Sequence, residues 1–498
     1  MEGQIHWTAL AVFVFFFVLV TVMGFAASRW QTGGKKKEAH LDEWGLGGRN
    51  FGTWITWFLV GGDFYTAYTV IAVPALVYAV GAYGFFALPY TILVYPIVFM
   101  IMPKLWHEAQ KAGHVTAADV VYGRYQSRPL ELAIAVTGVM ATMPYIALQL
   151  VGMEVVIKAL GLTGEFPLAA AFVILALYTY SAGLRAPALI AFVKDLMIYI
   201  VVLTAVILVP SKLGGYGNVF HAAGVAFAAK GGATGLILHP AQMLPYASLA
   251  IGSALAAFMY PHTLTGIFAA KSADTIRKNA IFLPAYTVLL GLIALLGYMA
   301  YAANLPIKNN NDVVPALFNA LFPPWFAGFA FAAIAIGALV PAAVMSIGAA
   351  NLFTRNFWKA YVQPDVTPSG EAKVAKIVSL VVKVGALVFI LFLPTKFALD
   401  LQLLGGVWIL QTFPAVVFGL FFNWFRGPAL LAGWAVGLLG GSWLAFSDGI
   451  KPVHTFLISG TNFTIYTGLI ALALNIVVAI IVQLVLGKKG VSEIRPAT

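Results

Sequence analysis

The chain has 498 residues, of which 61% are hydrophobic and 9% are charged, and its formal net charge is +11. Soluble domains carry about a quarter charged residues, so this composition excludes a soluble globular protein and predicts an all-helical, multi-pass membrane protein. Cysteine is absent, which excludes disulfides and thiolate-ligated metals. The basic residues are spread between apolar segments, so the net charge does not predict a nucleic-acid partner.

Apolar windows of about 20 residues predict thirteen transmembrane helices along the chain. Their expected limits are 7–27, 53–81, 84–103, 130–158, 165–182, 187–209, 244–268, 281–303, 325–352, 376–395, 398–421, 428–447 and 464–487. The polar stretches between these windows are short enough to be connectors. Residues 1–498 are therefore expected to form one transmembrane domain.

Basic residues between the predicted spans give the expected orientation, because cytoplasmic loops carry an excess of lysine and arginine. With the N-terminus outside, the inner segments hold 21 of the 29 basic residues and the outer loops hold five. The other three, Lys158, Lys194 and Lys383, lie within spans. This asymmetry predicts an outer N-terminus and an inner C-terminus.

The second and seventh predicted spans look interrupted by glycine and proline. The second contains Gly61, Gly62 and Pro74, and the seventh contains Gly252 and Pro261. Because lipid cannot satisfy the backbone groups that such residues free, each break is expected to line a cavity. Ordinary packing of small residues between helices is the alternative explanation.

The interval of five spans between the two interruptions suggests a pair of inverted repeats, with a substrate bound between them near the membrane midplane. The first repeat would cover 53–209 and the second 244–421. The peripheral helices would then be 7–27, 428–447 and 464–487.

Lys194 and Asp195 stand side by side in the sixth predicted span, which is otherwise apolar. Even low estimates put the insertion of each charge at about 2.5–3.5 kcal/mol, so such groups are expected to face a cavity, a partner or a transported ion. Neighbouring residues of a helix point about 100° apart, so a direct ion pair between the two is not assured. A lysine that snorkels toward the inner surface is the alternative interpretation.

Six short stretches in order along the chain resemble the sodium:solute symporter family. They are a glycine-arginine loop at 43–51, the segment 66–74 that resembles a broken helix, a loop at 116–128, a glutamine-bearing segment at 145–152, and the shorter stretches 183–186 and 269–272. Within this family the run 183–195 is most similar to bacterial monocarboxylate permeases, which carry lactate, pyruvate and related short acids.

The resemblance implies a LeuT-type core of ten helices, here spans 2–11, with a sodium site between the first and eighth core helices. Where the family usually has two hydroxyl residues for sodium, this sequence has Val340 and Pro341, which cannot ligate a hard cation. A shifted alignment would bring in Ser346 instead. Lys194 borders the same site, and its ammonium group would take the place of the sodium ion. The resemblance thus favours H⁺ as the coupling ion, with Na⁺ as the alternative.

The candidate site residues fall into two sets, and interhelical packing is the alternative interpretation for each of them. Hydroxyl and amide groups at the breaks, together with freed N–H groups at a half-helix N-terminus, suit a carboxylate substrate. The substrate-binding candidates are Tyr65, Thr66, Tyr68, Thr69, Gln149, Tyr260 and His262. The ion-coupling candidates are Lys194, Asp195, Asp63, Gly62, Val340 and Pro341.

The predicted function is secondary active import of short monocarboxylates by alternating access in the bacterial inner membrane. A sodium-coupled symporter of another organic solute, such as an amino acid, is the first alternative, and a channel is another. An enzyme or redox subunit is not expected, because no histidine pair has haem-like or metal-ligand spacing within the spans. No metal, cofactor or obligate protein partner is predicted; the expected partners are the monocarboxylate and membrane lipid.

Overall fold

The computed structural model describes residues 5–29, 40–62, 66–163, 166–231, 235–392 and 398–487, and most of these residues are helical. In the first half of the chain the helices are α1 (Trp7–Ala26), α2 (Leu41–Leu46), α3 (Thr53–Gly62), α4 (Val73–Val80), α5 (Ala87–Ala112), α6 (Ala117–Tyr125), α7 (Arg128–Ala159), α8 (Phe166–Ala182), α9 (Arg185–Lys212), α10 (Tyr216–Ala229) and α11 (Pro240–Ala257). In the second half they are α12 (Pro261–Ala269), α13 (Ala273–Phe282), α14 (Pro284–Ala294), α15 (Leu296–Ala302), α16 (Val313–Leu321), α17 (Pro324–Phe353), α18 (Pro368–Phe392), α19 (Ala398–Ile409), α20 (Gly419–Phe421), α21 (Gly427–Ser447) and α22 (Thr467–Leu486).

The helical membrane architecture that the composition predicts is confirmed. Nine helical segments in the described ranges are long and apolar enough to cross a membrane, and a bent pair raises the number to ten. These nine coincide with the first, third, fourth, sixth, eighth, ninth and last three predicted spans. Helices also occupy the other four predicted spans, but they are the pair α3 and α4, the 17-residue α8, the bent pair α11 and α12, and α18.

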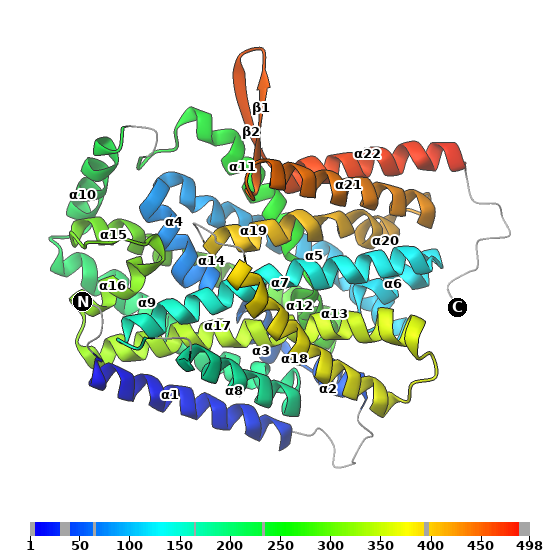
Figure 1. The fold of residues 1–498 in the computed structure, drawn as a ribbon, viewed down its shortest axis with the longest axis horizontal. Coiled ribbons are helices and arrows are strands. Elements are labelled where there is room, and N and C mark those ends of the chain that lie inside the picture. The colour runs from blue at the N-terminus through cyan, green and yellow to red at the C-terminus, as the bar shows by residue number, and fades with distance from the viewer. Residues whose placement is uncertain are drawn as a thin grey trace.

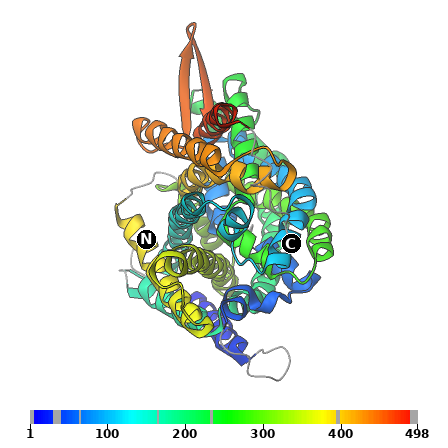
Figure 2. The same ribbon diagram turned by 90° about the vertical axis from the view of Figure 1, so that its right-hand side faces the viewer.

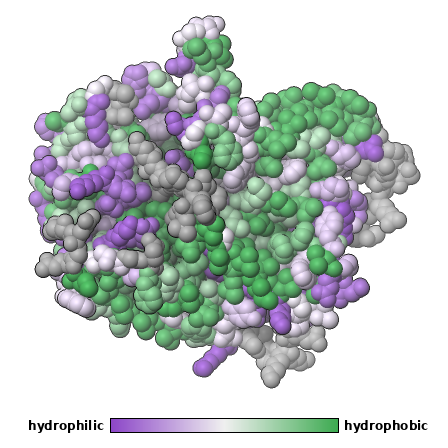
Figure 3. Space-filling view, in the orientation of Figure 1, coloured by the Kyte–Doolittle hydropathy of each residue, from purple (hydrophilic) through white to green (hydrophobic). Residues whose placement is uncertain are grey.

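The long helices run roughly parallel to one another, and α17 lies in the middle of the bundle (Figures 1 and 2). The apolar part of α17 is fully buried, and this helix packs against α1, α7 and α9. Helix α1 and the pair α21–α22 lie on opposite sides of the bundle (Figure 2). Figure 3 shows apolar residues over much of the visible flank and hydrophilic residues gathered toward the ends, the distribution that a bilayer requires.

The two ends of the bundle are named here by their helices. The α10 end, on the left of Figure 1, carries α10, α15 and α16, and the α6 end, on the right, carries α6, α13 and the start of α18. Helix α1 begins at the α10 end, whereas α22 finishes at the α6 end (Figure 1). The first described helix thus begins at one end of the bundle, and the last described helix finishes at the other.

The predicted break in the seventh span is confirmed. Helix α11 stops at Ala257, Tyr260 takes an extended conformation with φ −61° and ψ 138°, and Pro261 begins α12. The two helices are bent by 47°. Proline suits the first turn of a helix because that position needs no N–H donor, so the sequence directs α12 to start here.

The expected break in the second span falls on residues 63–65, which lie outside the described residues. On one side α3 ends at Gly62, and on the other a π-helical turn, Tyr68–Ala72, leads into α4. Residues 63–65 therefore connect the described part of α3 to the segment that begins at Thr66.

Several of the family-like stretches meet at the α6 end. Gly183 has φ +57°, and a Cβ atom there would lie 2.1 Å from the Trp44 carbonyl oxygen, which accepts a hydrogen bond of 2.9 Å from the Leu184 N–H. Only glycine fits this combination of backbone conformation and close approach. Phe51 likewise exchanges backbone hydrogen bonds with the segment 269–271. The motifs thus mark contacts between loops that are distant in sequence.

A two-stranded antiparallel hairpin joins α21 to α22, formed by β1 (Val453–Ile458) and β2 (Thr461–Tyr466). The sequence analysis does not predict it and instead begins the last span at 464. That start is wrong by three residues, because β2 runs to Tyr466 and α22 begins at Thr467. Ser459 and Gly460 both have positive φ, as the tight two-residue hairpin turns require.

Candidate functional site

Lys194 and Asp195 lie in the middle of α9 and are completely shielded from solvent. The ammonium nitrogen of Lys194 is 3.0 Å from Asp195 Oδ1. The two neighbouring side chains therefore form a direct ion pair despite pointing in different directions from the helix. A snorkelling lysine would carry its ammonium to the membrane surface, and Lys194 does not.

Each member of the pair is also held by another helix. The Lys194 ammonium donates a hydrogen bond of 2.6 Å to the carbonyl oxygen of Gly62, the last residue of α3. Tyr286 of α14 donates its hydroxyl to Asp195 Oδ2 at 2.7 Å. A backbone carbonyl is a strong hydrogen-bond acceptor, so the Gly62 oxygen stabilises the buried ammonium.

Two adjacent glycines allow α3 to come this close. A Cβ atom on Gly62 would lie 2.7 Å from the Lys194 nitrogen, and one on Gly61 would lie 2.3 Å from the ring of Tyr286. Both distances are shorter than real contacts. The glycine pair that the sequence marks as an interruption therefore gives the lysine and the tyrosine their space.

A second polar cluster surrounds the N-terminal side of the segment that follows the break. Gln149 of α7 is fully buried, and its side-chain oxygen accepts a hydrogen bond of 3.0 Å from the Ala67 N–H. The next N–H, that of Tyr68, donates to the Thr66 hydroxyl at 3.0 Å. In this conformation protein groups thus satisfy two of the N–H groups that the sequence analysis assigns to a carboxylate. Thr69 is buried one turn further along.

Aromatic side chains from two helices complete this cluster. The rings of Tyr145, Tyr260 and His262 lie 5.2–5.3 Å apart, centroid to centroid. Tyr260 donates its hydroxyl to the Gln402 carbonyl of α19 at 2.9 Å. Within the described residues, His262 Nδ1 and the Tyr68 hydroxyl are buried without hydrogen-bond partners. Buried polar atoms are normally paired, so these two are available to a ligand or to water.

The two clusters adjoin residues 63–65 from either side. Gly62 contacts the lysine and Thr66 belongs to the second cluster, and the two residues are four positions apart. Four extended residues span at most about 14 Å. Asp63 and Tyr65, both site candidates, lie between them and outside the described residues. A movement of the break would therefore affect both clusters.

Val340 and Pro341 lie in the buried centre of α17, which packs extensively on α9 and less extensively on α3. Ser346, the alternative hydroxyl, donates to the Ala343 carbonyl of its own helix at 2.8 Å. The described contacts do not join these three residues to the Lys194 cluster.

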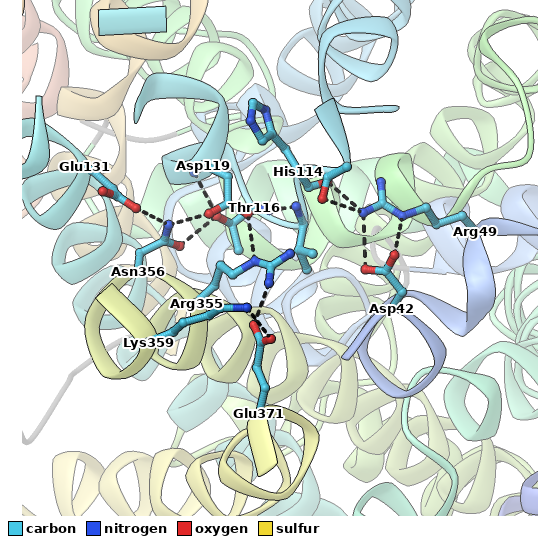
Figure 4. A network of polar contacts seen from close by, with 12 residues as sticks. Asp42, Arg49, His114, Thr116, Asp119, Glu131, Arg355, Asn356, Lys359 and Glu371 are labelled. Atoms are coloured by element: carbon cyan, nitrogen blue, oxygen red, sulfur yellow. Dashed lines mark hydrogen bonds and ion pairs between the residues drawn. The ribbon is translucent and has the colours of Figure 1, made fainter. Parts of the chain in front are cut away.

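At the α6 end a network of charged and polar side chains connects α6, α7, α18 and the π-helical segment Thr354–Val362 that extends α17 (Figure 4). Asn356 donates to Asp119 at 2.7 Å and to Glu131 at 2.8 Å. Arg355 bonds Glu371 at 2.8 Å, and Lys359 bonds the same carboxylate at 3.0 Å. The network ties the end of α17 to its neighbours.

A cavity of about 300 Å³ adjoins this network. Burial lowers the pKa of the His114 imidazole on its wall, which favours the neutral ring there. The cavity is lined by His114, Asp119, Tyr122, Arg128, Glu131, Arg355, Lys359, Ala360 and Pro364.

Three residues of the two clusters are missing from the sequence-based candidates. Tyr286 and Gln402 lie in predicted spans without any motif, and only the packing of α14 and α19 brings them to the clusters. Tyr145 belongs to the family-like stretch 145–152, one helical turn before Gln149, so that stretch contained a signal for it.

A buried ion pair within a membrane helix, together with a polar cluster at the bend between α11 and α12, defines the class of protein as a multi-pass membrane transporter. Residues 44–437 match the Sodium:solute symporter family, and the chain belongs to it. The resemblance seen in the short motifs is thereby confirmed, and the protein is a transporter rather than an enzyme.

Relatives match this chain over nearly its whole length. It is 73% identical to the "Monocarboxylate transport permease protein" of Rhizobium johnstonii, over 98% of this chain and 99% of the relative. It is 33% identical to the "Uncharacterized symporter YodF" of Bacillus subtilis, over 97% of this chain and 94% of the relative. A solved structure of a Na⁺-coupled sialic acid symporter, captured outward-open with substrate, superposes with a TM-score of 0.77 at 16% identity, over 97% of this chain and 98% of that one. This likeness shows the fold, which is the LeuT type.

Proposed function

We propose that this protein is a secondary active transporter that imports short monocarboxylates, such as lactate and pyruvate, across the bacterial inner membrane. The proposal is supported by the 73% identity to a relative named as a monocarboxylate permease. The cluster around Gln149 is compatible with a small anion, because it offers hydroxyl, imidazole and amide groups. In the proposed complex the carboxylate accepts hydrogen bonds from Tyr68 and His262, whose polar atoms have no described partner.

The proposed topology has thirteen spans, with the N-terminus outside and the C-terminus inside. The four predicted spans beyond the nine would be a broken helix, a short helix, a bent pair and α18. The proposed inverted repeats cover 53–209 and 244–421, and they place one interrupted helix at the start of each repeat. Alternating access would then move one repeat against the other around the two clusters.

The proposed coupling ion is H⁺, and Lys194 is the proposed carrier. The observation that carries this proposal is the contact between the buried Lys194 ammonium and the Gly62 carbonyl. In transporters with broken helices, unwound carbonyls and half-helix C-termini bind the coupling cation. A lysine ammonium at such a helix end supplies the same positive charge when protonated and removes it when neutral.

The second candidate is a sodium-coupled symporter of another small organic solute, such as an amino acid. The fold neighbour that favours it is described as Na⁺-coupled. In that case the Gly62 carbonyl and the Ser346 hydroxyl are the oxygen ligands to test. The Lys194 ammonium would then have to leave the Gly62 carbonyl before sodium could bind.

The direct experiment is uptake of labelled lactate into proteoliposomes, with the Na⁺ and proton gradients set independently. The proposal expects an inward proton gradient to drive accumulation in sodium-free buffer. A strict requirement for Na⁺ would contradict proton coupling without affecting the substrate assignment. Transport of amino acids and not of lactate would contradict the substrate assignment.

Lys194→Met tests the carrier. Removing one partner of a buried ion pair costs about 3–5 kcal/mol of folding stability, because the other charge is left buried without a partner. The double variant Lys194→Met with Asp195→Asn removes both charges and avoids this cost. Both are expected to lose gradient-driven accumulation, and Lys194→Arg is expected to lose it too, because guanidinium does not deprotonate in proteins.

The matched control is Lys383→Met. Lys383 of α18 is also a buried lysine in a membrane helix, but it donates to the Ser379 carbonyl of its own helix at 3.4 Å, and no described acid lies within ion-pair distance of it. This variant is expected to keep full uptake. Equal loss in Lys383→Met and the Lys194 variants would mean that removal of any buried lysine damages the protein.

A further inference from the structure

The β1–β2 hairpin stands apart from the helices that support it. In Figures 1 and 2 it projects away from the bundle, across the direction of α21 and α22 and at the ends of those helices nearer the α10 end. Its root is fixed: the Tyr466 N–H donates to the Ser248 hydroxyl at 2.9 Å, and the buried Tyr466 hydroxyl donates to the Leu403 carbonyl at 2.7 Å. The fold therefore sets the direction of the hairpin.

The strand register gives the hairpin two different faces, because side chains alternate along a strand. One face carries the pairs His454 with Ile465, Phe456 with Phe463, and Ile458 with Thr461. The opposite face carries the pair Val453 with the buried Tyr466 at the root, the pair Thr455 with Thr464, whose hydroxyls are 2.9 Å apart, and the pair Leu457 with Asn462. The first face, here called the Phe456 face, is the more apolar.

Large apolar side chains near the tip are open to the surroundings of the protein. The exposed fractions are 56% for Ile458, 37% for Phe463 and 73% for Leu457. Two-stranded hairpins are marginally stable in water, and exposed strand edges in water usually carry charged residues that prevent aggregation. The sequence from 452 to 487 contains no Asp, Glu, Lys or Arg. These features do not fit a hairpin that extends freely into water.

The apolar surface continues onto the helices at the root. Trp443 and Phe446, in the last turns of α21, are 75% and 60% exposed, and α22 is exposed and apolar along much of its length. In a membrane protein such a surface contacts lipid, and aromatic residues concentrate at the level of the headgroups. His454 on the Phe456 face is paired with Asp448 at 2.6 Å, at the root and away from the tip.

We propose that the β1–β2 hairpin is a membrane-surface anchor that lies in the headgroup layer around the ends of α21 and α22, with its Phe456 face toward the acyl chains. Threonine and asparagine on the other face and Ser459 at the turn then meet water and the polar headgroups, together with Leu457, which also lies on that face. This arrangement gives Ile458 and Phe463 a non-aqueous surface and holds the α21–α22 pair at a fixed depth. The hairpin then adds its own contact with the bilayer to those of α21 and α22.

Site-directed spin labelling in nanodiscs tests the proposal, and the absence of native cysteine makes single labels unambiguous. The labels replace Phe463 on the Phe456 face and its chain neighbour Asn462 on the opposite face. Leu439, which is 70% exposed on α21, provides the lipid-facing reference. Each label is probed for collisions with oxygen, which concentrates in lipid, and with a water-soluble nickel chelate. Lactate uptake by each labelled protein checks that it is folded.

The proposal expects the ratio of oxygen to nickel collisions at Phe463→Cys to approach the ratio at Leu439→Cys and to exceed that at Asn462→Cys. Equal, nickel-dominated ratios at Phe463→Cys and Asn462→Cys would show that the hairpin stands in water and would overturn the proposal. Exclusion of both reagents from Phe463→Cys would show that the tip is covered by protein, such as a second copy of the chain, and would overturn it equally.

Discussion

At the scale of single residues, the buried ion pair depends on the absence of a side chain at Gly62. Because Gly62 has no side chain, the Lys194 ammonium reaches its carbonyl at 2.6 Å while staying 3.0 Å from Asp195. The carboxylate in turn is oriented by the Tyr286 hydroxyl at 2.7 Å. Three helices thus meet here: α9 supplies both charges, and α3 and α14 contribute one hydrogen-bonding group each.

Gly62→Ala is expected to damage this arrangement directly. The added methyl group would lie 2.7 Å from the lysine nitrogen, so the ammonium or α3 must shift. Overpacking of this kind costs about 1–3 kcal/mol, and lactate accumulation should fall with it. The control is Gly217→Ala in α10, where nothing lies within 4 Å and a small gain in stability is expected. Thermal unfolding in detergent and uptake in proteoliposomes measure both, and wild-type uptake by Gly62→Ala would refute the assigned contact.

Tyr286→Phe removes the hydroxyl that donates a hydrogen bond to Asp195, so the buried carboxylate loses one of its donors. Loss of a hydrogen bond to a charged group costs about 1.5–3 kcal/mol, against about 0.5–1.5 kcal/mol for a neutral one. Tyr246→Phe is the matched control, since its hydroxyl donates to the neutral Phe85 carbonyl at 3.3 Å. The free energy of unfolding should therefore fall further in Tyr286→Phe than in Tyr246→Phe. Equal losses would indicate that Asp195 is not charged in the folded protein.

At the scale of elements, the Asn356 amide links the π-helical end of α17 to both α6 and α7. Asn356 uses a single nitrogen to bridge Asp119 and Glu131, and Arg355 and Lys359 hold Glu371 of α18 nearby (Figure 4). Helix α6 is itself fixed by a capping box, in which Thr116 and Asp119 satisfy each other's backbone groups. The network thus joins four elements at the α6 end of the bundle.

Asn356→Asp replaces the bridging donor with a third carboxylate between two others. Like charges at this distance repel, and the two acceptors lose their donor, so unfolding in detergent should occur at a clearly lower temperature. Asn309→Asp is the control, because the Asn309 side chain only accepts a hydrogen bond from the Asn311 N–H, which a carboxylate can also do. The defect of Asn356→Asp should shrink at acidic pH, where carboxylates are protonated. A defect that grows at acidic pH would contradict this explanation.

At the scale of the whole molecule, the described chain runs from one end of the bundle to the other. Helix α1 begins at the α10 end, and α22 finishes at the α6 end (Figure 1). The distribution of lysine and arginine between the two ends is the basis of the proposed orientation in the membrane.

Cysteine labelling in intact cells checks this orientation. Ser211 near the end of α9 and Lys271 between α12 and α13 are both exposed, and they lie at opposite ends of the bundle. An impermeant thiol reagent is expected to modify Ser211→Cys from outside and to leave Lys271→Cys unmodified until the membrane is permeabilised. The cysteine-free parent serves as the blank. The reverse pattern would invert the proposed topology.

The sequence by itself determined the features that depend on composition and on neighbouring residues. Long apolar windows predicted where helices lie, because a bilayer forces each crossing segment to satisfy its own backbone. The cost of a charge in lipid singled out Lys194 and Asp195, and glycine and proline marked the interruptions at Gly62 and Pro261. The six family-like stretches, in loops and in helices, were sufficient to identify the family.

The tertiary structure decided everything that joins distant parts of the chain. Gly62 lies 132 positions from Lys194, and Tyr286 lies 91 positions from Asp195, so no local pattern could reveal these contacts. The orphaned Tyr68 hydroxyl, the use of Gln149 by the Ala67 N–H, and the hairpin fixed by Tyr466 likewise depend on which helices pack together. The physical reason is that apolar periodicity in lipid says which segments are helices but not which faces meet, since lipid and protein interior are equally apolar and packing detail selects the partners.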